Sequence, residues 1–306
     1  MNAMGNERDA ETVSGQPLRV AVGIPTYNRG HVLLATVEQV LAQDPTADEV
    51  LVVDQSDWYP DGVRERLEAL ALQGSIRYVR QDTPNLPMAR NRILAETQCS
   101  VVIFIDDDVR LSHGFIGAHR SNYENDDVWA VCGRITEEGI PVREVKQRTW
   151  PKILDYRYAD FGWDRRDENF GTFKGCNHSV RRNVVLDLGG YDETYAGVAL
   201  REETDMAFRI INAGGRIVFD PEAYLHHMRA PAGGCRVSSW GDWSAGRSVL
   251  RFALKHRKLL GRHIWSELWR AYRLGVLNGS NISHPIRIAS RSAAFVRELM
   301  ALSMGR

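Results

Sequence analysis

Two kinds of hydrophobic pattern alternate along the first 110 residues. Short continuous apolar runs are typical of buried strands, and apolar residues spaced three and four apart are typical of amphipathic helices. The predicted strands are 18–24, 49–54, 76–79 and 101–105, and the predicted helices between them are 33–41, 63–72 and 88–96. Strands that alternate with helices indicate βαβ units and a parallel sheet. We therefore expect an α/β fold with a Rossmann-like, mostly parallel sheet and helices on both faces.

The second half of the chain is less regular. Its predicted strands and helix are 128–135, 216–219, 223–227 and 202–212, and residues 141–169 are rich in aromatic and charged side chains, as in a long loop or a helix and loop. From 238 onward the pattern is helical. The expected organisation is a disordered start (1–17), a catalytic domain (18–235, with halves 18–110 and 111–235) and a helical tail (236–306).

Three predicted strands end in polar or acidic residues. The first leads into Asn28, the second ends at Asp54, and the fourth ends at Asp106. Open α/β sheets bind ligands at the carboxyl ends of their strands. This edge therefore predicts a nucleotide-like ligand without reference to any motif.

Asp106 and Asp108 stand two apart at the end of a strongly apolar strand. In extended backbone their side chains share one face, and two carboxylates beside a phosphate suit Mg²⁺ or Mn²⁺. An acidic turn is the simpler alternative. A second alternative is an aspartyl-phosphate phosphatase with Asp106 as nucleophile. Against it, about a hundred residues precede the motif and no second acidic motif of the GDxxxD type follows it.

Acidic residues also open the predicted helix 202–212. Glu202, Glu203 and Asp205 fall in its first turn, where the helix dipole alone favours them. The functional alternative is a carboxylate base aimed at the sheet edge.

Two histidines and one arginine complete the candidate chemistry. His226 and His227 follow an apolar stretch, and because neighbours in a strand face opposite sides, only one of them is expected to ligate a metal through its imidazole. Arg90 follows a predicted strand and can pair with a diphosphate. The alternatives are a structural histidine and a surface arginine.

Composition excludes several classes of protein. The chain has 306 residues, with 39 Lys and Arg against 39 Asp and Glu. Such a balance argues against a disordered chain and against nucleic acid as a partner. The four cysteines form no CxxC pair, so no zinc ribbon or thioredoxin motif is expected. The polar N-terminus and the lack of a long apolar run predict a cytoplasmic protein, at most peripheral to a membrane.

The neutral total hides two opposite charges. Residues 236–306 hold 13 Lys and Arg against 3 Asp and Glu, a net charge of +10, so residues 1–235 carry −10. Basic amphipathic helices are typical of anionic membrane surfaces. The alternatives are a helical appendage packed on the catalytic domain and a homodimer contact.

Taken together, the motifs resemble family 2 glycosyltransferases of the GT-A fold. Seven segments carry the resemblance in order, within residues 18–230: Val20–Arg29, Val52–Asp57, Asn85–Asn91, Phe104–Asp108, Gly175–Arg182, Gly189–Glu193 and Glu202–Asp205. The resemblance implies an inverting transfer of a sugar from a nucleoside-diphosphate sugar to a hydroxyl of a surface glycan or lipid-linked glycan. It also implies an Mn²⁺ or Mg²⁺ cofactor. A non-catalytic module that binds sugar nucleotides is the alternative.

The resemblance also implies roles for single residues. The donor would be bound by Pro25, Thr26, Tyr27, Asn28, Asp54, Arg90, Asp106 and Asp107, the acceptor by Gly175, Asn177 and Trp163, and the metal by Asp106, Asp108 and His226 or His227. The family usually has aspartate where this chain has Glu203, so Glu202, Glu203 and Asp205 all remain candidates for the base.

Other nucleotide-binding classes fit less well. The first strand leads into Pro-Thr-Tyr-Asn rather than the glycine-rich loop of a nucleotidyltransferase, and no GxxxxGK[ST] motif is present. A processive polysaccharide synthase would carry membrane spans.

Overall fold

A sheet in the order β3-β2-β1-β4-β7-β6-β8-β5 forms the centre of the computed structural model, which describes residues 18–142, 148–234, 241–277 and 285–303. The strands are β1 (Val20–Thr26), β2 (Glu49–Asp54), β3 (Arg77–Arg80), β4 (Val101–Ile105), β5 (Val109–Leu111), β6 (Val128–Glu137), β7 (Asn177–Arg181) and β8 (Arg216–His227). The predicted disordered start, 1–17, lies outside the described residues.

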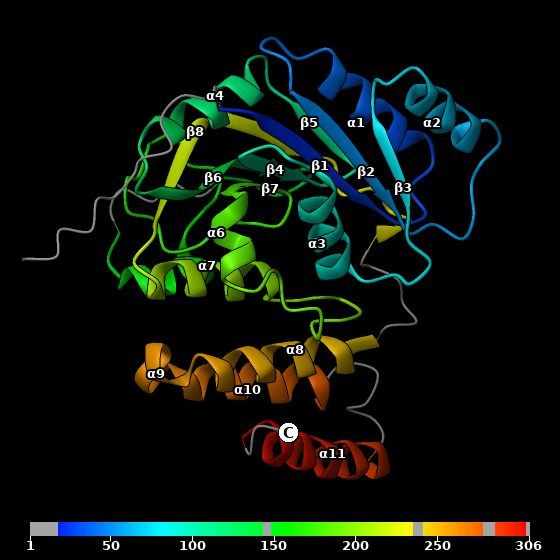
Figure 1. Cartoon of the computed structure of the whole chain (residues 1–306). Coiled ribbons are helices and arrows are strands. Elements are labelled where there is room, and N and C mark those ends of the chain that lie inside the picture. Colours follow the sequence, from blue (N-terminus) through cyan, green and yellow to red (C-terminus); the bar gives the residue numbers. More distant parts are fainter. Residues whose placement is uncertain (1–17, 143–147, 235–240, 278–284, 304–306) are drawn as a thin grey trace, which may run out of the picture.

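Helices cover both faces of this sheet (Figure 1). They are α1 (His31–Leu41), α2 (Val63–Leu72), α3 (Leu86–Glu96), α4 (Phe115–Ser121), α6 (Arg182–Asp187) and α7 (Glu202–Asn212). Along β1, Val20, Val22 and Ile24 pack against α1, α2 and α4, whereas Ala21 packs toward α3 and α7. The two-residue period of the strand thus divides the core into two layers.

The sheet confirms the predicted α/β fold. Strands β3, β2, β1 and β4 are parallel neighbours, and β6 is parallel to β8. Strand β7 is antiparallel to both β4 and β6, and the three-residue β5 is antiparallel to β8. Because β1, β2 and β4 run the same way, Thr26, Asp54 and Asp106 meet at one edge.

One prediction for the second half needs correction. The expected strands 216–219 and 223–227 form one strand, β8, which continues through Pro221. Its register with β6 shifts between Gly133 and Ile135, and such an irregularity accommodates a residue that cannot donate to the ladder. In 148–169 the described residues form η2 (Lys152–Leu154) and α5 (Asp155–Tyr158) with loops around them, which agrees with the predicted helix and loop.

The C-terminal helices form a further layer beneath α7 (Figure 1). They are α8 (Gly241–Lys255), α9 (Arg257–Leu260), η5 (Gly261–His263), α10 (Ile264–Gly275) and α11 (Pro285–Ser303). Phe208 of α7 packs on Phe252 of α8, with ring centroids 5.1 Å apart. Gly246 and Gly275 let α8 and α10 approach closely, because a Cβ on Gly246 would meet the Gly275 backbone at 2.6 Å. Among the described helices, none is long and apolar enough to cross a membrane.

Candidate functional site

A cavity of about 260 Å³ opens at the carboxyl ends of β1 and β4. Ten of the predicted site residues line it: Pro25, Thr26, Tyr27, Arg90, Asp106, Asp107, Gly175, Glu202, Glu203 and His227. Loop, strand and helix residues that are far apart in the sequence therefore converge on one space. This convergence defines the candidate site.

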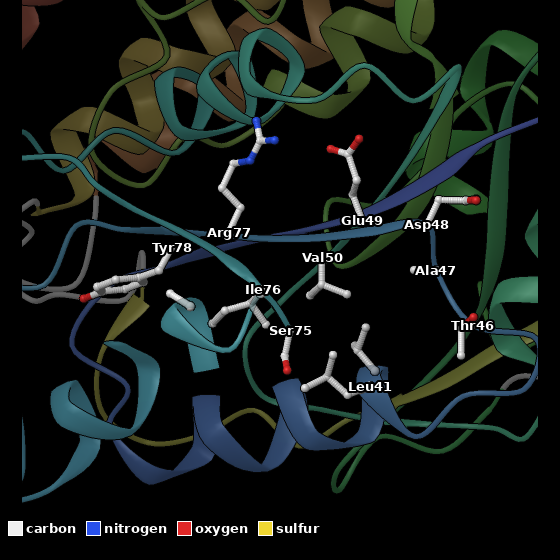
Figure 2. A pocket seen from close by; sticks show the side chains of 13 residues that line it. Leu41, Thr46, Ala47, Asp48, Glu49, Val50, Ser75, Ile76, Arg77 and Tyr78 are labelled. Atoms are coloured by element: carbon white, nitrogen blue, oxygen red, sulfur yellow. The ribbon is translucent and has the colours of Figure 1, made fainter. Parts of the chain in front are cut away.

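A larger cavity, about 650 Å³, lies at the opposite edge of the sheet, where β2 and β3 begin (Figure 2). It holds none of the predicted site residues. Its charged side chains form ion pairs with neighbouring residues: Arg77 with Glu96, Glu49 with Arg19, and Asp48 with Arg120. We assign no chemistry to this cavity.

The three consecutive aspartates after β4 have different surroundings. Asp106 faces the smaller cavity. Asp107 accepts a hydrogen bond of 2.6 Å from Thr26 Oγ1 and lies 3.0 Å from Arg29 Nε. Asp108 is fully buried, accepts a hydrogen bond of 2.7 Å from the Ala230 amide and lies 3.3 Å from Arg29 Nη2. Arg29, which the sequence analysis did not select, thus compensates two of the three carboxylates.

These surroundings shift the pKa values in opposite directions. Burial raises the pKa of Asp106, and it raises the pKa of Asp107 to about 7 against the charge of Arg29. Burial also acts on Asp108, but the hydrogen bond with His227 and the charge of Arg29 outweigh it and lower its pKa. Asp108 is therefore held as a carboxylate.

The two neighbouring histidines face opposite sides of β8. His227 Nε2 lies 3.1 Å from Asp108 Oδ1 and 3.6 Å from Asp106 Oδ2. His226 instead contacts Thr136 Oγ1 through Nδ1 at 2.8 Å and Glu138 through Nε2 at 3.2 Å. The strand alternation therefore directs His227 to the cavity, and His226 does not line it.

Cys176 is a third group beside these residues that the sequence analysis did not select. One donor atom each from Asp106, Cys176 and His227 lies within 4.8 Å of the others. Burial raises the pKa of the Cys176 thiol well above its ordinary value. Carboxylate and imidazole donors at this spacing fit a divalent cation such as Mn²⁺.

Arg90 and Glu202 form a buried ion pair at the base of the cavity. Arg90 Nη2 also donates to the Gly175 carbonyl at 3.2 Å, and its guanidinium lies 5.4 Å from the Tyr191 ring centroid. A Cβ on Gly175 would lie 2.7 Å from Arg90 Nη2, so a larger residue here would displace the guanidinium from this position. Glu202 is therefore occupied in fixing Arg90.

Glu203 is the half-buried carboxylate that lines the cavity without such a partner. It makes no hydrogen bond or ion pair with the part of the chain that the structure describes. It stands in the first turn of α7, where the unpaired amides and the helix dipole favour a negative charge.

Asp205 points away from the cavity, toward the C-terminal helices. Its carboxylate contacts His256 Nε2 at 2.8 Å, Lys255 Nζ at 2.8 Å and Arg209 Nε at 2.9 Å. Burial opposes ionisation, but these partners together lower the pKa of Asp205. The third candidate base thus connects α7 to α8 and is not a lining residue.

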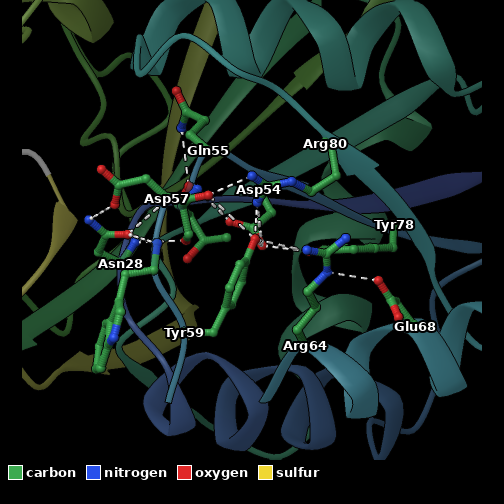
Figure 3. Close-up of polar contacts among 12 residues, drawn as sticks. Asn28, Asp54, Gln55, Asp57, Tyr59, Arg64, Glu68, Tyr78 and Arg80 are labelled. Carbon is green, nitrogen blue, oxygen red and sulfur yellow. Dashed lines mark hydrogen bonds and ion pairs between the residues drawn. The ribbon is translucent and has the colours of Figure 1, made fainter. Parts of the chain in front are cut away.

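Asp54, the predicted base-binding residue, is buried and enclosed by side chains from β3 and from the loop after β2 (Figure 3). Tyr59 and Tyr78 donate their hydroxyls to Oδ2 at 2.7 Å, and the Ser56 amide donates to Oδ1 at 2.8 Å. Arg80 lies 3.2 Å from Oδ2. The cavity is lined instead by the next residue, Gln55.

Three further predicted residues lie outside the cavity lining. Asn28 has a φ of 54° and exchanges hydrogen bonds with Asp57 (Figure 3). Asn177 Nδ2 donates to two backbone carbonyls, those of Arg134 and Ala223. Trp163 is packed in the core against Phe219. Their assigned roles in binding donor or acceptor stay predictions.

Lys174 also lines the cavity and was not selected from the sequence. Its ammonium lies 4.9 Å from the Phe161 ring centroid. The sequence offered a reason to select Arg29, because a cation directly after the polar end of the first strand faces the same edge as the aspartates. For Lys174 and Cys176 the sequence offered no reason beyond their place beside Gly175.

Solved structures of low sequence identity share this fold. S. aureus TarS 1-349 in complex with UDP-GlcNAc aligns with a TM-score of 0.63 at 14% identity, over 92% of this chain and 81% of that one. The mannosyltransferase PcManGT from Pyrobaculum calidifontis, in complex with GDP-Man and Mn²⁺, aligns with a TM-score of 0.58 at 17% identity, over 92% of this chain and 75% of that one.

Proteins that are similar to this chain in sequence include a polysaccharide biosynthesis protein and a glycosyltransferase. The succinoglycan biosynthesis protein ExoM of Rhizobium meliloti is 26% identical over 269 residues, which cover 86% of this chain and 83% of ExoM. The glucosyl-dolichyl phosphate glucuronosyltransferase of Haloferax volcanii is 26% identical over 222 residues, 69% of each chain. Residues 21–189 match the sequence profile of glycosyl transferase family 2. The chain is a glycosyltransferase and belongs to glycosyl transferase family 2.

Proposed function

We propose that this glycosyltransferase moves a sugar from a nucleoside-diphosphate sugar to an acceptor hydroxyl in one metal-dependent, inverting displacement. The observation that carries the proposal is the pairing of Glu203 with the Asp106 and His227 group in one cavity. A free carboxylate and a cluster of metal donors are the two parts that such a displacement needs.

Glu203 acts as the general base in this proposal. It takes the proton of the acceptor hydroxyl while the oxygen attacks the anomeric carbon. The C1–oxygen bond forms as the bond to the diphosphate breaks, and the sugar passes through an oxocarbenium-like state. Glu202 does not compete for the proton, because Arg90 holds it as a buried partner.

Asp106 and His227 would hold the cation, with Asp108 orienting His227 through the contact at 3.1 Å. A bound Mn²⁺ or Mg²⁺ would supply positive charge to neutralise the departing diphosphate. The Mn²⁺ in the related mannosyltransferase structure supports this cofactor class.

The acceptor class is inferred from the relatives. Their names describe succinoglycan biosynthesis and a glucuronosyltransferase for glucosyl-dolichyl phosphate. We therefore propose a surface glycan or a lipid-linked glycan as acceptor.

Substitution of Glu203 by Gln tests the base. The variant removes the proton acceptor and keeps the size of the side chain, so transfer from a panel of nucleotide sugars should fall by about 10²–10⁴-fold while donor binding persists. Glu65→Gln, on the exposed surface of α2, is the matched control. Unchanged turnover in Glu203→Gln, or loss of donor binding, contradicts the assignment.

We also propose that α10 docks on an anionic membrane surface. Trp265 and Trp269 are 73% and 59% exposed, and exposed Arg262 and Arg273 continue their stripe at helical spacing. Tryptophan beside arginine is typical of helices that lie in a lipid interface. The net charge of +10 on residues 236–306 complements anionic headgroups.

Flotation with anionic liposomes tests this surface. The full chain should float with them at low salt, and Trp265→Ala with Trp269→Ala should reduce flotation, whereas Trp58→Ala, an equally exposed tryptophan near α2, should not. Failure of the folded wild-type chain to float contradicts the proposal. If the paired substitutions instead dissociate a dimer, the stripe binds a second copy and the membrane assignment fails.

A further inference from the structure

Cys176 and Asp106 lie beside each other at one end of the paired strands β4 and β7. Strands β4 and β7 are antiparallel, and their last pair is Ile105 with Asn177. Asp106 directly follows β4 and Cys176 directly precedes β7 in a turn, so both residues lie next to this last pair. The pairing of Val109 with His227 between β5 and β8 brings the imidazole to the same place. The fold therefore gathers three different donor types from three separate segments.

Cys176 and His227 each have a side-chain atom without a hydrogen-bond partner among the described residues. Cys176 is 8% exposed, lines the cavity and has no hydrogen bond from its thiol among the described residues. His227 is 6% exposed, and its Nδ1 is buried without a hydrogen-bond partner in the same part of the chain. If the side chain of Cys176 served packing alone, an apolar residue would suffice at this position. A buried imidazole with one unpaired nitrogen is energetically unfavourable unless a ligand binds that nitrogen.

We propose that Cys176 is a metal ligand, so that the centre binds thiophilic divalent ions through an Asp106–Cys176–His227 donor set. The inference rests on the proposed function, which places the catalytic cation at Asp106 and His227. Soft thiolate favours Zn²⁺ and Co²⁺ over Mg²⁺, and site affinities rise from Mn²⁺ through Co²⁺ to Zn²⁺. Three protein donors also match a zinc site that keeps one position open. The thiol proton passes to solvent as sulfur binds the ion.

Cobalt spectroscopy of the full chain, without donor or acceptor, tests the ligand. Addition of Co²⁺ should produce the near-ultraviolet sulfur-to-cobalt absorption band. Cys176→Ser should lose that band and should bind Zn²⁺ at least about 10-fold more weakly, with a smaller loss for Mn²⁺. Cys176→Ala, which keeps the position uncharged and small, should lose the band equally. Cys99→Ser, a buried thiol outside the cavity, should keep it.

The outcomes separate this inference from the proposed function. A wild-type chain that binds Co²⁺ without the sulfur band, or a Cys176→Ser variant that keeps the band, overturns the role of Cys176. His227→Ala should abolish Co²⁺ binding if the centre lies where we propose. If Co²⁺ binds His227→Ala as it binds the wild type, the proposed metal centre fails together with its thiolate.

Discussion

Arg90 on α3 and Glu202 on α7 form an ion pair in which each side chain is 1% exposed. The pair connects α3, from the first half of the chain, to the helix that carries Glu203. A buried pair of this kind costs most when one partner is removed, because the other charge is left without compensation.

The first prediction concerns this pair. Arg90→Ala should lower the free energy of unfolding by about 3–5 kcal/mol, because Glu202 then remains buried and unpaired. Arg92→Ala is the matched control: it pairs with Glu96 at 2.7 Å but is 54% exposed, and it should cost less than about 1 kcal/mol. Urea denaturation measures both. Equal losses in the two variants would contradict the buried-pair account.

The second prediction concerns acid stability. His119 lies in a chain of hydrogen bonds that fixes its neutral form: Tyr123 donates to Ser179, Ser179 contacts His119 Nδ1 at 2.9 Å, and His119 Nε2 contacts Asn177 Oδ1 at 3.0 Å. The Asn177 amide donates elsewhere, so its oxygen accepts from Nε2. Burial lowers the pKa of His119 from 6.5 to about 4.

Since the unfolded chain binds the proton first, stability is fully present above pH 6.5 and is lost as the pH falls toward 4. The loss from this residue should reach roughly 3 kcal/mol. His119→Gln should show a correspondingly smaller drop between pH 7 and pH 4.5 in urea titrations. A pH dependence identical to that of the wild type would refute the assignment.

The third prediction concerns Asp54. Because Tyr59, Tyr78 and Ser56 all donate to its carboxylate, Asp54→Asn should unpair at least one buried donor and lower the unfolding free energy by about 1–3 kcal/mol. Asp61→Asn, exposed in the following loop, should change it little. If thermal denaturation shows no loss in Asp54→Asn, the carboxylate is not structural.

The fourth prediction concerns metal binding measured as stability. Mn²⁺ at a hundred times its dissociation constant should stabilise the fold by about 2.7 kcal/mol, provided that it binds only the folded chain. His227→Ala should abolish this gain, whereas His226→Ala, whose ring contacts Thr136 and Glu138, should keep it. Thermal shift with and without a chelator measures the difference. A gain that survives in His227→Ala would place the cation elsewhere.

The sequence predicted the parallel half of the sheet well, and the reason is local. Strand 101–105 is apolar on both faces and ends at Asp106, so its burial and its polar edge are visible in the residues themselves. Strand β5 was missed, because three residues carry no period and pair only with the distant β8. The antiparallel β7 was also missed, because its five residues are mostly polar and it pairs with the distant β4 and β6.

The sequence identified the types of residue in the candidate site better than it identified the role of each residue. The alternation along β8 limited the candidate metal ligand to one of two histidines, and the structure turns His227, not His226, toward the cavity. The adjacency of Glu202, Glu203 and Asp205 gave no way to rank them. Their partners, Arg90 and His256, come from distant segments, and these partners distinguish the three acids.

The contact between His256 and Asp205 has a consequence for how this enzyme can vary. A chain cut after β8 would leave the Asp205 carboxylate without His256 and Lys255, and would expose Phe208 where Phe252 now covers it. The helices that follow β8 therefore cannot be exchanged independently of α7. A chimera that grafts another relative's C-terminus should stay active only when the acid on α7 and its partners His256 and Lys255 are inherited as a set.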